Sequence, residues 1–100
     1  MAQVKVASLA KLKEQVVMKV AANGKEIALY FADGNVYATD NTCPHENGPL
    51  GEGFLEGKII TCPMHGWQFD VRTGRHAFMP GIKVPTFKVE IKNGDVLVDI

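Results

Sequence analysis

The sequence predicts an all-β protein whose small antiparallel sheets form a sandwich or a barrel. Short apolar runs alternate with turn residues along the chain, and four turns carry a hairpin signal: Asn23-Gly24, Asp33-Gly34, Glu56-Gly57 and Asn93-Gly94. Asn-Gly and Asp-Gly between apolar runs are strong hairpin signals, because both residues tolerate positive φ. With 100 residues and 46% hydrophobic side chains, we expect a single domain over residues 1–100 with a modest core.

In chain order, the strands expected around these turns lie at residues 4–7, 16–20, 26–31, 36–38, 53–55, 58–61, 86–91 and 96–98. Between the first two, the segment from Ser8 to Glu14 can hold a single helical turn, since Leu9 and Leu12 are three residues apart. The hairpin formed by residues 53–61 lies between two loops rich in Pro and Gly. A hairpin brings its ends together, so we expect these loops to lie side by side.

These two loops carry the residues with metal-binding chemistry. Cys43 and His45 form a C-P-H segment, and after sixteen intervening residues Cys62 and His65 form C-P-M-H. Each segment offers one thiolate and one imidazole, and both cysteines of the protein are used. This is the ligand set of an iron–sulfur cluster in which two histidines replace two cysteines on one iron. The sequence therefore predicts one [2Fe–2S] cluster.

Other uses of these residues remain open at this point. Two cysteines and two histidines also make a closed tetrahedral zinc site, although familiar zinc modules pair like ligands, as in C-x-x-C followed by H-x-x-x-H. A disulfide is less favoured, because the N-terminus lacks an apolar run of signal-peptide length and a reduced pair suits the cytoplasm. Buried inert cysteines would not each bring a histidine at short spacing.

The segments CPHENGPLG, from Cys43, and CPMHGWQFDVRTG, from Cys62, resemble the two-part Rieske signature. The whole chain resembles the small Rieske-type ferredoxins that serve bacterial aromatic-ring dioxygenases. The resemblance implies the Rieske fold with a cluster-binding subdomain at about residues 40–80. It implies that Cys43 and Cys62 bind one iron, and that His45 and His65 bind the solvent-side iron. It also implies two redox partners, a flavin-dependent ferredoxin reductase as donor and a terminal ring-hydroxylating oxygenase as acceptor.

Departures from high-potential respiratory Rieske proteins predict a lower reduction potential. Those relatives carry an additional cysteine in each of the two signature segments, and the two cysteines form a disulfide. The matching positions in this chain are Gly48 and Met64. The respiratory relatives also place serine and tyrosine hydroxyls near the cluster sulfurs, where this chain has Trp67 and Phe69. Fewer donors to sulfur leave the reduced state less stabilised.

Three further features of the loops lead to expectations. The glycines in and beside the two signature segments are expected to permit tight or positive-φ turns around the cluster: Gly48, Gly51, Gly53 and Gly66. Met79-Pro80-Gly81 resembles the third, proline-containing loop of the family. His76 is the remaining histidine, and we expect it to be an exposed polar residue.

A cluster with fully ligated irons has no open position for substrate, so the chain is predicted to carry electrons and not to be an enzyme. A catalytic oxygenase would also need a mononuclear iron site of two histidines and a carboxylate. With His45 and His65 assigned to the cluster, His76 is the one histidine left, so this chain cannot build that site alone. The alternative is a Rieske-type small subunit of a larger reductase, such as nitrite reductase. The lack of a basic surface argues against nucleic-acid binding, and the lack of an eighteen-residue apolar run argues against a membrane span. We expect a cytoplasmic monomer.

Overall fold

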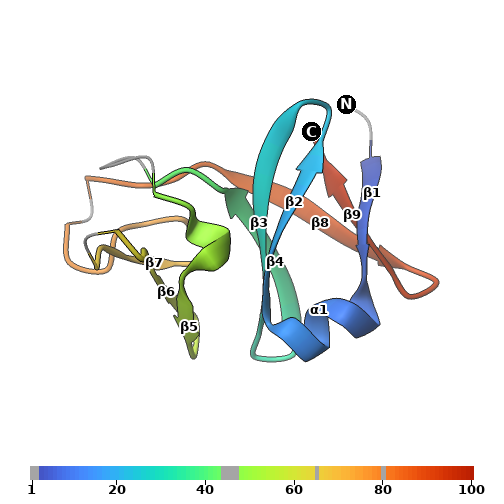
Figure 1. Ribbon diagram of the computed structural model, residues 1–100, viewed down its shortest axis with the longest axis horizontal. Helices are drawn as coiled ribbons and strands as arrows, with labels where there is room; N and C mark the ends of the chain where they lie inside the picture. Colours follow the sequence, from blue (N-terminus) through green and yellow to red (C-terminus); the bar gives the residue numbers. More distant parts are fainter. Residues whose placement is uncertain (1–2, 44–47, 65, 80) are drawn as a thin grey trace.

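The computed structural model describes residues 3–43, 48–64, 66–79 and 81–100. These residues form a six-stranded and a three-stranded antiparallel sheet, one α-helix and one short 3₁₀ helix (Figure 1). The elements are β1 Gln3–Ser8, α1 Leu9–Gln15, β2 Val17–Ala22, β3 Lys25–Ala32, β4 Asn35–Asp40, η1 Leu50–Glu52, β5 Phe54–Glu56, β6 Ile59–Thr61, β7 Gln68–Asp70, β8 Thr86–Lys92 and β9 Asp95–Asp99.

The larger sheet has the strand order β1-β9-β8-β4-β3-β2. Three of its connections are the predicted hairpins, and in each turn both central residues have positive φ: Asn23 and Gly24, Asp33 and Gly34, and Asn93 and Gly94. This is the backbone of the hairpin turns that match the natural twist of paired strands. The predicted all-β class and these hairpins are confirmed.

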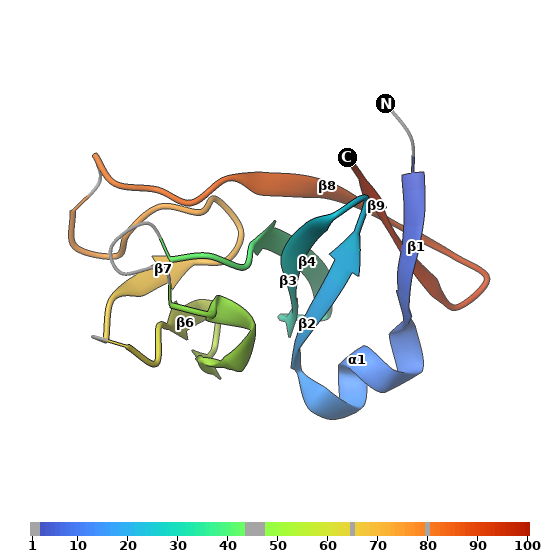
Figure 2. The ribbon, with the colours of Figure 1, turned by 45° about the horizontal axis from the view of Figure 1, so that its top comes forward.

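Helix α1 joins β1 to β2, which are the two edge strands of the larger sheet (Figures 1 and 2). It begins after Ser8, whose hydroxyl accepts a hydrogen bond from the Lys11 N–H at 3.2 Å. It ends at Val16, which has a φ of 72° and donates its N–H to the Leu12 carbonyl at 2.6 Å. The helix has seven residues, and it is therefore longer than the single turn predicted from the spacing of Leu9 and Leu12.

The smaller sheet has the strand order β5-β6-β7. Its first hairpin is the predicted one at Glu56 and Gly57, with Phe54 paired to Thr61. Strand β7 was not predicted, because a three-residue strand is too short to show the alternation on which strand prediction depends. After β7, isolated bridges continue this antiparallel pairing between Phe69 and His76 and between Arg75 and Lys83.

Strand β3 separates two buried clusters of apolar side chains. Successive side chains of a strand point to opposite faces, so Ile27 and Leu29 pack with Leu12 of α1, whereas Ala28 and Tyr30 face the smaller sheet. The cluster that contains Ala28 and Tyr30 also contains both cysteines. The near-continuous apolar run of β3 is thus explained by burial on both faces.

Within the described ranges, no helix is long and apolar enough to cross a membrane.

Candidate metal centre

The two cysteines begin loops that close in the same way. The Cys43 N–H donates to the Gly48 carbonyl at 2.8 Å, and the Cys62 N–H donates to the Trp67 carbonyl at 2.7 Å, so each bond reaches five residues ahead. The second loop is tightened further by a 3.1 Å bond from the Gly66 N–H to the Cys62 carbonyl. The predicted ligands His45 and His65 belong to these loops and lie outside the described residues.

The two loops lie against each other, as the hairpin between them predicted. A Cβ atom placed on Gly48 would lie 2.6 Å from the Cys62 Sγ and 2.5 Å from the Met64 Cγ. Positions 48 and 64 are therefore neighbours, which agrees with their expected correspondence to the disulfide-bearing positions of respiratory relatives. With glycine and methionine in these two positions, the disulfide of the respiratory relatives cannot form here.

The four glycines in and beside the two signature segments were expected to form tight or positive-φ turns, and positive φ is found at one of them. Of the four, Gly66 has a positive φ, of 74°, which a non-glycine residue adopts at a cost. Gly48, Gly51 and Gly53 are instead constrained by space: a Cβ at Gly51 or Gly53 would lie 2.6 Å or 2.2 Å from a neighbouring oxygen. These three positions need a small residue because another part of the chain passes close by.

Cys43 and Cys62 are both buried, with exposed fractions of 1% and 2%. They share one buried cluster with Leu50, Ile60 and Phe69. A pair of reduced thiols at the ends of two adjoining loops offers soft thiolate ligands in a site from which water is largely excluded. The described part of the predicted ligand set therefore fits an iron–sulfur cluster.

Asn41 positions the first cysteine loop and was not among the residues predicted for the site. The residue is buried and follows β4; its backbone carbonyl accepts from the Leu50 N–H at 2.7 Å, and its Oδ1 accepts from the Gly51 N–H at 2.7 Å. Its own N–H donates to the Glu26 carbonyl of β3 at 3.2 Å. Asn41 thus ties η1 to the larger sheet; its place two residues before Cys43 was the available signal.

A buried hydroxyl pair lies in the cluster that contains the cysteines. Tyr30 is fully buried, and its hydroxyl lies 2.7 Å from the Thr39 Oγ1. Thr39 donates its proton to the Asp40 carbonyl at 3.0 Å, so Tyr30 acts as donor in the first bond. Burial raises the pKa of Tyr30 well above its usual value, against a smaller opposing effect of the hydrogen bond with Thr39. Tyr30 therefore stays neutral and adds no charge beside the cysteines.

Trp67 and Phe69 follow the second cysteine loop directly. Phe69 is fully buried in the cluster that contains the cysteines, and Trp67 is half-buried and packs against that cluster. Their ring centroids are 6.4 Å apart. Phenylalanine offers no hydroxyl in this position, and the indole of Trp67 offers an N–H donor.

The expectation that His76 is exposed is wrong. Its exposed fraction is 6%, and its ring packs edge-on against Trp67 and Phe69, with centroid distances of 4.8 Å and 5.3 Å. Its Nδ1 accepts from the Phe78 and Met79 N–H groups at 3.1 Å each. This burial has no local signal around residue 76, because the aromatic residues that surround His76 come mostly from β7 and the loop before it.

The turn after β7 is held by Asp70. Its Oδ1 accepts from the Arg72 N–H at 2.8 Å, and the Arg72 guanidinium contacts its Oδ2 at 2.9 Å. The hydrogen bond with Arg72 is the main reason that the pKa of Asp70 is lowered. This turn leads the chain from the second cysteine loop toward His76.

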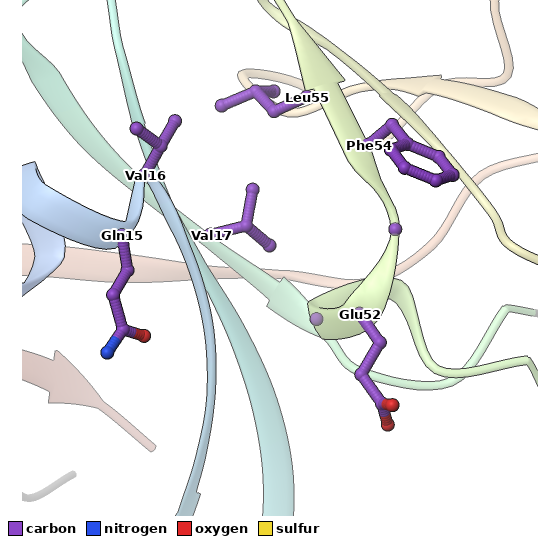
Figure 3. A pocket seen from close by; sticks show the side chains of 8 residues that line it. Gln15, Val16, Val17, Glu52, Phe54 and Leu55 are labelled. Carbon is purple, nitrogen blue, oxygen red and sulfur yellow. The ribbon is translucent and has the colours of Figure 1, made fainter.

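An open cleft of about 370 Å³ separates the end of α1 from η1 and β5 (Figure 3). Gln15, Val16 and Val17 line one side, and Glu52, Phe54 and Leu55 line the other. Its lining offers one carboxylate, from Glu52, and no histidine or cysteine. The cleft therefore provides neither a metal-ligand set nor a nucleophile with a base.

Two adjoining cysteine loops, presented by a small antiparallel sheet beside a larger one, fit an iron–sulfur protein of the all-β class. The chain belongs to the Rieske [2Fe-2S] domain family, which matches residues 2–88. A ferredoxin component of the naphthalene 1,2-dioxygenase/salicylate 5-hydroxylase systems from Ralstonia sp. is 45% identical over 93 residues, covering 92% of this chain and 89% of the relative.

A solved complex of reduced oxygenase and oxidised ferredoxin in carbazole 1,9a-dioxygenase contains a chain with a TM-score of 0.86 and 36% identity, covering 96% of this chain and 91% of that one. A nitrite reductase small subunit matches with a TM-score of 0.83 at 20% identity, which shows a shared fold alone. The predicted family, fold and Rieske-type [2Fe–2S] cofactor are thus confirmed, and zinc is not the metal. The protein is an electron carrier, since the relatives that it matches over nearly their full length are ferredoxin components of dioxygenase systems.

Proposed function

We propose that this chain passes single electrons from a flavin-dependent ferredoxin reductase to a terminal oxygenase that hydroxylates aromatic rings. The observation that carries the proposal is the likeness to dioxygenase ferredoxin components over nearly the full length of both chains. The alternative, a small subunit of nitrite reductase, has in its favour a likeness of fold without comparable sequence identity. A monomer that works in the cytoplasm is part of the proposal.

The proposal assigns the cluster to a subdomain of about residues 40–80. Cys43 and Cys62 would hold one iron, and His45 and His65 would hold the other. The cluster, when bound, accepts and releases one electron at a time. Burial of both cysteines keeps water from the thiolates, and the loop closures at Gly48 and Trp67 hold their backbones in place.

Exposed apolar side chains at the cysteine end of the molecule support docking of a partner there. Met64, on the second cysteine loop, is 53% exposed, and Phe78 and Met79, on the neighbouring loop, are 76% and 43% exposed. The cysteine loops and the loop that contains Phe78 lie at the same end of the molecule (Figures 1 and 2). Aromatic and methionine side chains are enriched in the buried centres of protein interfaces.

The test mixes the chemically reduced protein with the oxidised terminal oxygenase of carbazole 1,9a-dioxygenase and follows both visible spectra by stopped flow. We expect reoxidation of the chain with a matching reduction of the oxygenase, at a rate that depends on oxygenase concentration. Phe78→Ser should slow this transfer, whereas Ile91→Ser should not, although Ile91 on β8 is also an exposed apolar residue, at 41%. No transfer to this oxygenase or to that of a naphthalene 1,2-dioxygenase system would refute the proposed function.

The histidine assignment has its own test. A variant with both His45→Cys and His65→Cys would carry four thiolates, and the added negative charge opposes reduction. We expect a lower reduction potential by voltammetry. An unchanged or raised potential in a variant that holds a full cluster would contradict ligation by these histidines.

A further inference from the structure

The buried imidazole of His76 holds the backbone of the segment that follows it. Its Nδ1 accepts hydrogen bonds from both the Phe78 and the Met79 N–H groups, at 3.1 Å each. Because Nδ1 accepts, the ring proton is on Nε2, which is buried and meets no acceptor among the described residues. The segment belongs to no strand, so a side chain satisfies amides that would otherwise need water.

The backbone of His76 closes the same segment. Its N–H donates to the Ile82 carbonyl at 2.8 Å, and the Ile82 N–H donates to the Met79 carbonyl at 2.9 Å. The Ala77 N–H donates to the Gln68 carbonyl of β7 at 2.8 Å. The segment is therefore anchored at both ends, and the imidazole adds the contacts in its middle.

The ring of His76 also packs against residues at the end of the second cysteine loop and in β7. The ring of His76 meets that of Trp67 at 4.8 Å and 85°, and that of Phe69 at 5.3 Å and 74°. Trp67 supplies the carbonyl that closes the loop of Cys62. One imidazole thus connects the backbone at residues 78–79 to the residue that ends the cysteine loop.

The side chains carried by this fixed backbone point outward. Phe78 and Met79 are exposed although their amides are bonded to a buried ring. An exposed apolar side chain on a mobile loop must lose conformational entropy when it binds, and a backbone fixed in advance avoids part of that cost. The geometry suits a contact surface that is ordered before the partner arrives.

We propose that His76 is a positioning residue for docking of the electron-accepting oxygenase, acting through the backbone of Phe78 and Met79. This inference rests on the proposed function for its partner, and on the contacts of His76 for its mechanism. The essential group is Nδ1, which accepts both hydrogen bonds, and packing of the ring against Trp67 orients Nδ1 toward the two amides.

Two variants separate the acceptor from the ring. His76→Phe keeps an aromatic ring beside Trp67 and Phe69 but removes the acceptor. His76→Asn removes the ring but places Oδ1, an acceptor, on the same atom that carries Nδ1 in histidine. The first measurement is amide hydrogen exchange at Phe78 and Met79 in the cluster-loaded protein. We expect protection to fall roughly fivefold at each amide in His76→Phe, since each amide loses one hydrogen bond and that bond contributes about a factor of five, and to persist in His76→Asn.

The second measurement is the dependence of electron transfer on the concentration of the carbazole 1,9a-dioxygenase oxygenase. We expect the half-saturating concentration to rise several-fold in His76→Phe, with the maximal rate and visible spectrum unchanged, and to return toward the parent value in His76→Asn. Parent-like protection of both amides in His76→Phe, or loss of protection in His76→Asn, would overturn the inference. Failure of the parent protein to transfer electrons would refute the proposed function instead, while the exchange measurement would still decide what His76 does to the segment.

Discussion

The substitution Gly48→Ala tests whether the two cysteine loops must approach as closely as the structure shows. A Cβ at this position would lie 2.5 Å from the Met64 Cγ and 2.6 Å from the Cys62 Sγ. Carbon atoms in favourable contact are about 3.5–4.0 Å apart, so the added methyl group overlaps both neighbours by roughly 1 Å.

The two neighbours differ in their ability to move. Met64 is 53% exposed and its side chain is flexible, so it can rotate away at little cost. Cys62 is 2% exposed, and its backbone N–H and carbonyl are both hydrogen-bonded within its loop. Gly48 in turn accepts the hydrogen bond from the Cys43 N–H, so a shift of Gly48 also displaces the first cysteine loop.

Overpacking of this kind costs about 1–3 kcal/mol. Since each 1.4 kcal/mol corresponds to a tenfold change in an equilibrium constant, cluster retention should fall by roughly 5- to 150-fold. The measurements are iron content per chain, the ratio of visible to ultraviolet absorbance, and the thermal melting temperature of the purified protein. We expect Gly48→Ala to lose most of its colour and to melt at a lower temperature.

Gly81→Ala is the matched control, because Gly81 lies in a loop at the same end and a Cβ there would meet nothing within 4 Å. Adding Met64→Ala to Gly48→Ala removes the 2.5 Å overlap with the Cγ of residue 64, keeps its Cβ at 3.1 Å, and leaves the overlap with the Cys62 sulfur. We expect this double variant to remain poor in iron. Full iron content in Gly48→Ala, or complete recovery in the double variant, would refute the reasoning.

Three further predictions concern the cysteines, Phe69 and Asp70. Cys43→Ser or Cys62→Ser should abolish the cluster and lower stability, since metal binding is coupled to local folding; a normally coloured, normally stable serine variant would overturn the assignment. Phe69→Tyr should raise the reduction potential by tens of millivolts if its hydroxyl reaches a cysteine sulfur, because a hydrogen bond contributes about 1 kcal/mol and about 59 mV corresponds to 1.4 kcal/mol; an unshifted potential with an intact spectrum would place the hydroxyl elsewhere. Asp70→Asn should lower stability at pH 7 by less than about 1 kcal/mol, because the contact with Arg72 is largely exposed. The folded-state pKa of Asp70 is lowered, so this contribution is present above the unfolded pKa of about 3.9 and is lost as the pH falls through the folded value; denaturation curves that differ equally at pH 7 and pH 2.5 would contradict it.

Local features of this chain were predictable because they depend on neighbouring residues. Asn23 and Gly24 form a hairpin turn because each adopts positive φ at low cost, whatever surrounds them. Cys43 and Cys62 were identified as ligand candidates from their chemistry and from the histidine that follows each at short spacing. Even the approach of their loops followed from a local hairpin between them.

Features that depend on distant parts of the chain required the tertiary structure. His76 is buried because Trp67 and Phe69 surround it, and a polar residue in a short loop carries no sequence signal of such neighbours. Strand β7 is defined by its pairing with β6, since three residues are too few to show a period of two.

By itself, the sequence determined the all-β class, the hairpins and the cysteine-histidine chemistry of the site, because turn geometry and ligand type belong to individual residues and their immediate neighbours. Only the tertiary structure decided that Gly48 must be small, that Asn41 ties the first cysteine loop to β3, and that His76 holds the neighbouring loop. Each of these depends on a side chain or a backbone group brought close by folding, and burial and steric contact are properties of that arrangement.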